Sequence, residues 1–169
     1  MFLFCEGIMR KFEKISFEQF KKDVSNDKKL YNEYPLPKRE TEFAAGYDFY
    51  ALSDFVIKPG EIKKVPTGVK VLMEDDEVLA LVLRGSQGFI YNLRLINQFG
   101  VVDKDYYNNP TNEGHLWIGL KNEGKMDYVV SKGQGIAQGL FMKYLLTDDD
   151  GETDKIFRND NDLYLKEVI

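Results

Sequence analysis

The chain alternates short apolar runs with turn residues along most of its length. The runs are rich in Val, Ile, Leu and aromatic residues and are bounded by Gly, Pro, Asp or Asn, as is typical of short β-strands joined by tight turns. No helical period separates them, so the sequence predicts an all-β sandwich or jelly roll. The predicted strands cover residues 54–57, 64–71, 77–84, 93–97, 115–121, 127–130 and 136–144.

The two ends of the chain depart from this pattern. Ser16 and Gln19 form a capping-box pattern, which predicts a short helix with Phe17 and Phe20 on one side. Two prolines within residues 34–39 then favour an extended segment, and an acidic run follows residue 147. We therefore expect an N-terminal extension with a short helix over residues 1–35, a β domain over residues 36–146 and a C-terminal arm over residues 147–169.

Composition and charge narrow the possible functions. The 169 residues are 43% hydrophobic and 30% charged, which is typical of a globular protein and not of a disordered or collagen-like chain. No apolar run approaches the roughly 18 residues of a transmembrane helix, so we expect no membrane association and a cytoplasmic location. The net charge of −5 argues against nucleic acid as a partner. The single Cys5 and a lone His leave no disulfide and no structural zinc site.

Three segments combine turn glycines with polar side chains that β-sheet cores rarely contain. Residues 44–50 place Asp48 between aromatic residues, although this carboxylate could simply cap a turn. Residues 100–106 place Asp103 at the end of an apolar run, with Tyr106 three positions on, as in a hairpin that presents an acid and an aromatic wall; an Asp-rich turn is the alternative. Residues 133–138 place an amide directly before a buried strand.

In this order the segments resemble the trimeric dUTPase family, in particular its variant from low-GC Gram-positive bacteria and their phages. The resemblance runs from about residue 36 to residue 142. It includes Leu-Pro-Lys-Arg at 36–39, Ala-Ala-Gly-Tyr-Asp at 44–48, Pro-Gly-Glu at 59–61, Pro-Thr-Gly-Val-Lys at 66–70 and Asp-Glu-Val-Leu at 76–79. The longest match is Gly-Val-Val-Asp-Lys-Asp-Tyr-Tyr-Asn-Asn-Pro at 100–110, followed by Asn-Glu-Gly-His at 112–115.

The resemblance implies a homotrimer of jelly-roll subunits with three shared sites, in which Mg²⁺ helps to hold a nucleoside triphosphate. It implies that Asp103 orients and deprotonates the attacking water, a general-base role. Asp48 matches an acid linked to hydrated Mg²⁺. The residues implied in nucleotide binding are Asn97 and Gly100 at the uracil hairpin, Tyr106 under the sugar, Arg84 and Ser86 in the phosphate loop, and Gln138 near the phosphates.

The sequence departs from this family in the phosphate-binding half. Gly85 stands where the family has a hydroxyl after the arginine, and Gln134-Gly135 replace an acid and an arginine. The glycine-rich C-terminal arm has no counterpart, and the segment with Lys155 and Arg158 takes its place. One lost transition-state donor costs roughly 10²- to 10³-fold in rate, so these losses argue against efficient hydrolysis.

Three functional hypotheses follow. The first is a nucleotide-binding protein that sequesters or senses a nucleotide-like ligand with little hydrolysis, for example a phage protein that binds a host nucleotide signal. The alternative is an active dUTP diphosphatase, with Lys155 and Arg158 replacing the family's arm. The third is an interaction protein that engages a partner through its N-terminal extension. We expect Trp117 to be a core residue and the lone His115 to be a surface or interface group.

Overall fold

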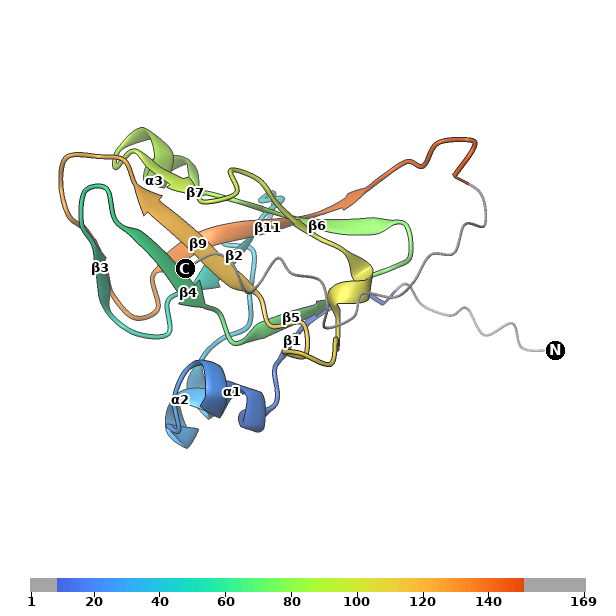
Figure 1. Ribbon diagram of the computed structural model, residues 1–169, viewed down its shortest axis with the longest axis horizontal. Helices are drawn as coiled ribbons and strands as arrows, with labels where there is room; N and C mark the ends of the chain where they lie inside the picture. Colours follow the sequence, from blue (N-terminus) through green and yellow to red (C-terminus); the bar gives the residue numbers. More distant parts are fainter. Residues whose placement is uncertain (1–8, 151–169) are drawn as a thin grey trace.

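A computed structural model of the chain describes residues 9–150 (Figure 1). The strands are β1 (Lys11–Lys14), β2 (Tyr47–Tyr50), β3 (Phe55–Ile57), β4 (Ile62–Pro66), β5 (Val69–Leu72), β6 (Glu77–Val82), β7 (Leu93–Leu95), β8 (Gly100–Val102), β9 (Trp117–Asn122), β10 (Tyr128–Val130) and β11 (Gly135–Lys143). The helices are α1 (Phe17–Asp23), α2 (Lys28–Glu33), α3 (Gly85–Phe89) and the 3₁₀ helix η1 (Lys104–Tyr106). The predicted all-β fold with a short N-terminal helix is confirmed.

Four small antiparallel sheets enclose the core. The largest has the strand order β2-β11-β6-β8, and a three-stranded sheet has the order β4-β9-β7. The other two sheets are the two-stranded pairs β1-β5 and β3-β10. Because consecutive strands pass between sheets, the arrangement is jelly-roll-like, and α3 and the β7–β8 turn lie at points where the chain crosses over.

Each of the seven predicted runs contains a strand, but β1, β2 and β8 were not predicted, and one predicted run is broken in two. The predicted strand over residues 64–71 is divided into β4 and β5, because Gly68 between them adopts a φ of +73°. The amide of Gly68 donates to His115 Nε2 at 2.8 Å and is therefore not used to pair with a neighbouring strand. A side chain at Gly68 would also meet the ring of Tyr34 at 2.8 Å.

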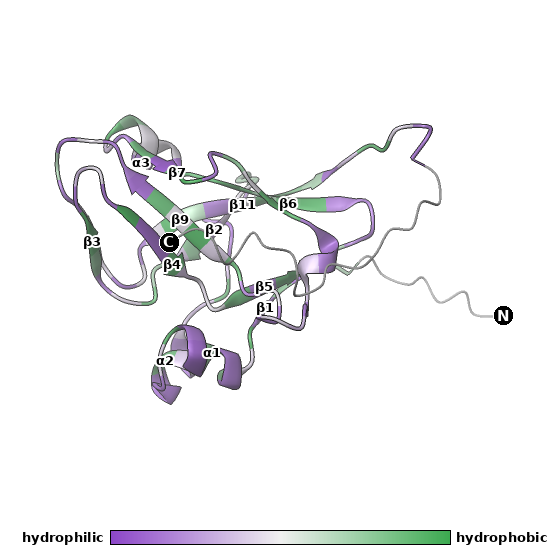
Figure 2. Ribbon diagram, in the orientation of Figure 1, coloured by the Kyte–Doolittle hydropathy of each residue, from purple (hydrophilic) through white to green (hydrophobic). Residues whose placement is uncertain are grey.

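The N-terminal segment packs against the β domain. Strand β1 pairs with β5 from Lys11↔Leu72 to Lys14↔Val69. The hydroxyl of Ser16 caps α1 by accepting from the amide of Gln19, as the capping pattern predicts, but the Gln19 side chain turns to Asp23 instead. A second helix, α2, was not predicted. The polar faces of α1 and α2 are plain in Figure 2.

Aromatic side chains join the N-terminal helices to the core. Phe20 is fully buried and stacks on Tyr34 with ring centroids 5.5 Å apart. The Tyr34 hydroxyl donates to the carbonyl of Gly68 at 2.7 Å. Residues 9–35 therefore contribute to the same core as the sheets. The boundaries at residues 35/36 and 146/147 stay predictions, and most of the expected C-terminal arm lies outside the described residues.

The core comprises apolar side chains from the sheets and from the N-terminal segment. Its largest fully buried members are Phe20, Phe49, Ile15, Ile57, Leu79, Ile118, Leu120 and Ile136. Within residues 9–150, no helix is long and apolar enough to cross a membrane.

Candidate functional site

Asp48, Arg84 and Gln138, which are far apart in the sequence, meet at the centre of the four-stranded sheet. Gln138 on β11 lies opposite Asp48 on β2 and opposite Val82 on β6. Arg84 follows β6, and its Nη2 lies 3.4 Å from Asp48 Oδ2. The Gln138 amide donates to the carbonyl of Leu83 at 3.1 Å, which ties the end of β6 to β11.

The electrostatics of this cluster depend on burial. The Asp48 side chain is 7% exposed, and burial raises its pKa above the ordinary value, while the charge of Arg84 acts in the opposite direction. The Arg84 side chain is 40% exposed, so its guanidinium can reach both the carboxylate and a ligand in solvent. A cation that is paired on one side and open on the other suits an anionic ligand such as phosphate.

Gly135 makes room for this guanidinium. A Cβ atom at Gly135 would lie 2.5 Å from Arg84 Nη1 and 3.3 Å from Arg84 Cζ. The Arg84 side chain therefore lies directly over the backbone of β11 at the position where the resemblance implies another arginine. Any side chain at Gly135 would displace Arg84.

Helix α3 fixes the backbone on which Arg84 sits. Gln87 is 2% exposed, and its Oε1 accepts from the backbone amide of Arg84 at 2.9 Å. Its Nε2 donates to the carbonyl of Ile136 on β11 at 2.9 Å. The sequence analysis missed Gln87; its place three residues after the helix N-cap was the available signal. Ser86, the other predicted phosphate-loop residue, lies exposed on the same helix.

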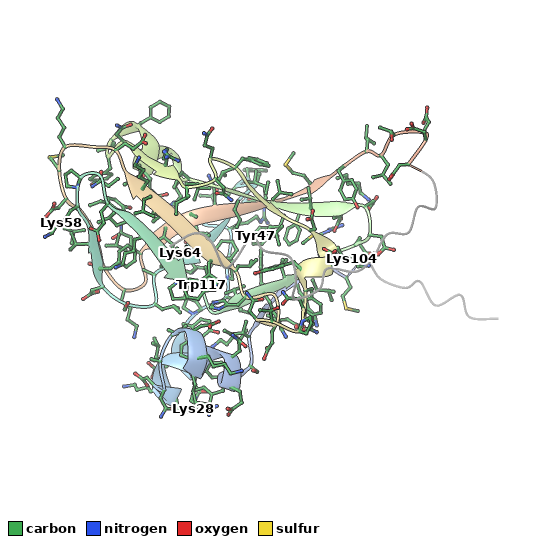
Figure 3. All side chains as sticks on the ribbon, viewed as in Figure 1. Lys28, Tyr47, Lys58, Lys64, Lys104 and Trp117 are labelled. Carbon is green, nitrogen blue, oxygen red and sulfur yellow. The ribbon has the colours of Figure 1, made fainter. Side chains whose placement is uncertain are left out.

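A second group of predicted residues borders a cavity of about 670 Å³. Asn97 lines it from the turn between β7 and β8, and Gly100 lines it from the start of β8. Most of the surface that lines the cavity is apolar, which suits the flat faces of a nucleobase and a sugar. Figure 3 shows Trp117 and Lys64, two further lining residues, near each other between the strands and helix α1. Trp117 therefore borders a cavity, whereas a core position was expected.

Tyr106 is held beside this cavity by hydrogen bonds. Its hydroxyl donates to the carbonyl of His115 at 3.3 Å and accepts from Asn112 Nδ2 at 2.9 Å. Asn112 and Thr111 line the cavity themselves. The ring of Tyr106 packs partly against the hydrophobic core, so both its edge and its hydroxyl are fixed.

His115 is fully buried, and the expectation of a surface or interface group is wrong. Its Nε2 accepts from the amide of Gly68, so Nδ1 carries the proton and donates to Asp23 Oδ2 at 2.6 Å. Burial lowers the pKa of His115, with Asp23 opposing the shift. Asp23 and Gln19 of α1 also line the cavity, a role that the sequence analysis missed because their partner lies 92 residues away.

Asp103 lies away from the Arg84 cluster within one chain. It directly follows Val102, which pairs with Leu79 on β6, whereas Arg84 comes after the opposite end of that strand. Five positions from Leu79 to Arg84 span roughly 16 Å at about 3.3 Å per residue. In Figures 1 and 3, Lys104, the residue after Asp103, and helix α3 lie on opposite sides of the molecule. Asp103 is exposed at the N-terminus of η1.

The metal prediction rests on a single described carboxylate. Within residues 9–150, no three His, Cys, Asp or Glu side chains are grouped closely enough to hold a metal ion. Mg²⁺ is usually bound through one or two carboxylates together with substrate phosphates and water, and not by a cage of protein ligands. Asp48, buried next to a cation that faces solvent, fits that mode.

Comparisons with known proteins all identify the same family. A protein-family model described as dUTPase matches residues 32–160. The deoxyuridine 5'-triphosphate nucleotidohydrolase of Lactococcus lactis subsp. lactis is 46% identical over 120 residues, which are 71% of this chain and 80% of that protein. The Haemophilus influenzae protein of the same name is 36% identical over 119 residues, 69% of this chain and 75% of its own.

Solved structures give the same result. The crystal structure of dUTPase from Streptococcus mutans matches with a TM-score of 0.66 and 44% identity, covering 81% of this chain and 98% of that one. The dUTPase from phage phi11 of S. aureus matches with a TM-score of 0.62 at 18% identity, covering 88% and 97%, and shows a shared fold alone.

These relatives overturn the first functional hypothesis. A protein that sequesters or senses a nucleotide with little hydrolysis is contradicted by curated relatives up to 46% identical that are named nucleotidohydrolases. The hypothesis was wrong because it added the missing groups as independent losses. It left out that Arg84 lies over Gly135, so that one guanidinium remains at the position of the missing arginine.

Proposed function

The chain belongs to the dUTPase family, and we propose that it hydrolyses dUTP to dUMP and pyrophosphate. The observation that carries the proposal is the cavity of about 670 Å³ bordered by Asn97, Gly100 and Asn112, with the Tyr106 hydroxyl bonded to Asn112. Asp103 directly follows β8, the strand that begins at Gly100. A cavity for a nucleobase and a sugar, together with an exposed carboxylate that follows β8, suits hydrolysis better than binding alone. A protein that only binds a nucleotide does not need a general base.

The nucleoside half of the site recognises the base and the sugar. We propose that the amide of Asn97 and the backbone around Gly100 read uracil from the hairpin. Tyr106 packs under the deoxyribose and leaves no room for a 2′-hydroxyl. Its hydroxyl bonds to His115 and Asn112 hold the ring in place, so the fit does not depend on ordering a mobile side chain.

Asp103 supplies the base for the chemical step. Its carboxylate accepts a proton from a water molecule as the water oxygen forms a bond to the α-phosphorus of dUTP. The bond from this phosphorus to the bridging oxygen breaks, and pyrophosphate leaves with that oxygen. Because Asp103 is exposed, a water molecule can reach its carboxylate.

The phosphate half relies on fewer groups than the family resemblance leads us to expect. Arg84 contacts the phosphates from its place over Gly135, and Gln138 holds the strand end that carries it. Gly85 and Gln134 supply neither the hydroxyl nor the acid of the family pattern. Lys155 and Arg158 stand in for the glycine-rich arm; both lie outside the described residues.

Mg²⁺ is the cofactor that the proposal requires. Asp48 would hold it, with the substrate phosphates supplying further oxygens. When bound, the ion neutralises charge on the triphosphate and polarises the phosphoryl oxygens. The chain's own part is to keep Asp48 next to Arg84, so that the carboxylate carries its charge despite burial.

The active form is a homotrimer with sites shared between subunits. Asp103 and Arg84 belong to one reaction centre, yet roughly 16 Å of strand separates their backbones within a chain at about 3.3 Å per residue. A second subunit that brings its hairpin to the Arg84 cluster of the first would close this gap. Exposed apolar side chains on β8 and β11, including Val101 and Met142, are available for such contacts.

Pyrophosphate release from dUTP in the presence of Mg²⁺ tests the proposal. We expect turnover by the wild-type protein and a loss of at least about 10²-fold in Asp103→Asn, which keeps the shape but not the base. Asp105→Asn, two residues further on in η1, is the matched control and keeps full activity. Absence of pyrophosphate release from wild-type protein, or equal rates in both variants, would contradict the assignment.

A further inference from the structure

The N-terminal segment forms hydrogen bonds to the loop that follows Asp103. Three residues of the segment 13–23 form hydrogen bonds to residues 107–115. The Tyr107 hydroxyl donates to Glu13 Oε2 at 2.6 Å, and the backbone amide of Ser16 donates to Glu113 Oε2 at 2.9 Å. The third contact is the buried bond from His115 Nδ1 to Asp23 at 2.6 Å.

The loop over residues 107–115 contains two residues with an unfavourable backbone conformation. Asn108 and Glu113 have φ values of 55° and 60°, in the left-handed region that non-glycine residues rarely adopt. Such backbone conformations persist only where the surroundings fix them. The family-model match begins at residue 32, so the N-terminal partners in these contacts, including Asp23 of α1, lie outside it.

Hydrogen bonds connect α1 through His115 to Tyr106, whose hydroxyl also accepts from Asn112 in the cavity lining. Gln19 Nε2 donates to Asp23 Oδ2 at 2.8 Å, and the same oxygen accepts from His115 Nδ1. The carbonyl of His115 in turn accepts from the hydroxyl of Tyr106. The far side of the imidazole is fixed by the amide of Gly68, so the ring cannot turn without breaking a second bond.

We propose that Asp23 is a positioning residue for substrate binding, which acts through His115 to set the place of Tyr106 beneath the sugar. The inference rests on the proposed hydrolysis of dUTP and adds a role for the N-terminal helix. Asp23 acts as a hydrogen-bond acceptor here, because His115 is neutral with its proton on Nδ1. The N-terminal segment thereby becomes part of the substrate site and not only of the core.

Two substitutions separate the acceptor from the charge. Asp23→Asn keeps a side-chain oxygen for His115 Nδ1–H, whereas Asp23→Leu removes it at similar volume. Glu18→Gln is the control on the same helix, because Glu18 is 76% exposed and pairs only with Lys21 in the part of the chain that is described. The steady-state hydrolysis of dUTP and the unfolding temperature are measured for each variant.

Two further measurements do not depend on turnover. The chain has one histidine, so a long-range ¹H–¹⁵N spectrum reports the tautomer of His115 without assignment. It also has one tryptophan, Trp117, which lines the cavity, so its fluorescence reports the binding of dUMP. The tautomer is read on wild-type protein and keeps the proposal falsifiable even if Asp23→Leu does not fold.

The expected results are specific. Wild-type His115 shows the proton on Nδ1, Asp23→Leu raises KM for dUTP and Kd for dUMP by roughly tenfold, and kcat stays within about twofold, since ground-state and transition-state binding are lost alike. Asp23→Asn and Glu18→Gln stay within about threefold of wild type in KM. A purely structural Asp23 would lower the unfolding temperature and leave KM of the folded variant unchanged.

The proposal is overturned by a proton on Nε2, or by an unchanged KM and Kd in folded Asp23→Leu. A wild-type protein that binds dUMP but releases no pyrophosphate from dUTP would refute the proposed function instead. The positioning role would then be decided by the tautomer and by dUMP binding alone.

Discussion

Replacing Gly135 by alanine tests whether the place of Arg84 matters for activity. The added Cβ would lie 2.5 Å from Arg84 Nη1, against 3.4 Å or more in an ordinary contact, so the guanidinium must retreat by roughly 1 Å. A misplacement of about 1 Å at a reacting centre can cost on the order of 10²-fold in rate. We therefore expect kcat/KM for dUTP to fall by about 10- to 100-fold in Gly135→Ala.

Stability responds differently to this change. The atom that the new methyl group meets is the end of a flexible side chain that is 40% exposed, so it can move at little cost. Gly135 has no left-handed φ, and alanine fits its backbone. The free energy of unfolding is expected to stay within about 1 kcal/mol of wild type, as for most substitutions that leave the core unchanged.

The assay is pyrophosphate release from dUTP, run beside urea unfolding of the same preparations. Gly88→Ala on helix α3 is the matched control, because a Cβ there meets nothing within 4 Å. Full activity in Gly135→Ala would refute the reasoning. So would an activity loss accompanied by an equal loss of stability, because the effect would then arise from the fold and not from Arg84.

Three further changes test other parts of the account. Phe20→Ala empties a fully buried site and is expected to lower the free energy of unfolding by about 3–5 kcal/mol in urea titrations; a loss below about 1 kcal/mol would mean that the N-terminal segment is not part of the core. Burial holds the pKa of His115 below its ordinary 6.5, so the unfolded chain binds the proton more readily, and stability measured by urea is expected to fall as pH drops through 6.5 and to be flat above it. A stability that rises over that interval would show a charged His115 in the folded state. Removing Mg²⁺ with EDTA is expected to lower dUTP turnover at least about tenfold and to leave the unfolding temperature unchanged, because the described residues form no metal cage; thermal unfolding with and without Mg²⁺ checks the second part.

Much of the fold follows from local pattern. Alternating apolar residues place most strands, and the proline and glycine turns delimit them. The break between β4 and β5 was missed because it depends on the left-handed Gly68, whose amide is directed at His115. Strand β1 was missed because four residues carry too little alternation, and its partner β5 lies more than fifty positions away.

The candidate site shows the same division between local and long-range information. The family resemblance pointed to Asp48, Arg84 and Gln138, and sheet register brings them together. The burial of His115 and the part played by Asp23 depend on a contact across 92 residues, which no local pattern reveals. The prediction of little hydrolysis has the same origin. The sequence shows which phosphate-binding groups are missing, but not that Arg84 occupies the space over Gly135.

Mixing two inactive variants tests most directly the central claim that dUTP is hydrolysed at a site shared between subunits. Asp103→Asn and Arg84→Gln each lack one part of the proposed reaction centre, and the two parts lie near opposite ends of β6. When the two chains are co-expressed, mixed assemblies contain sites that have both Asp103 and Arg84. We predict that pyrophosphate release from dUTP rises well above the sum of the separate variants. Activity that stays at that sum, while the wild-type protein is active, would contradict the claim.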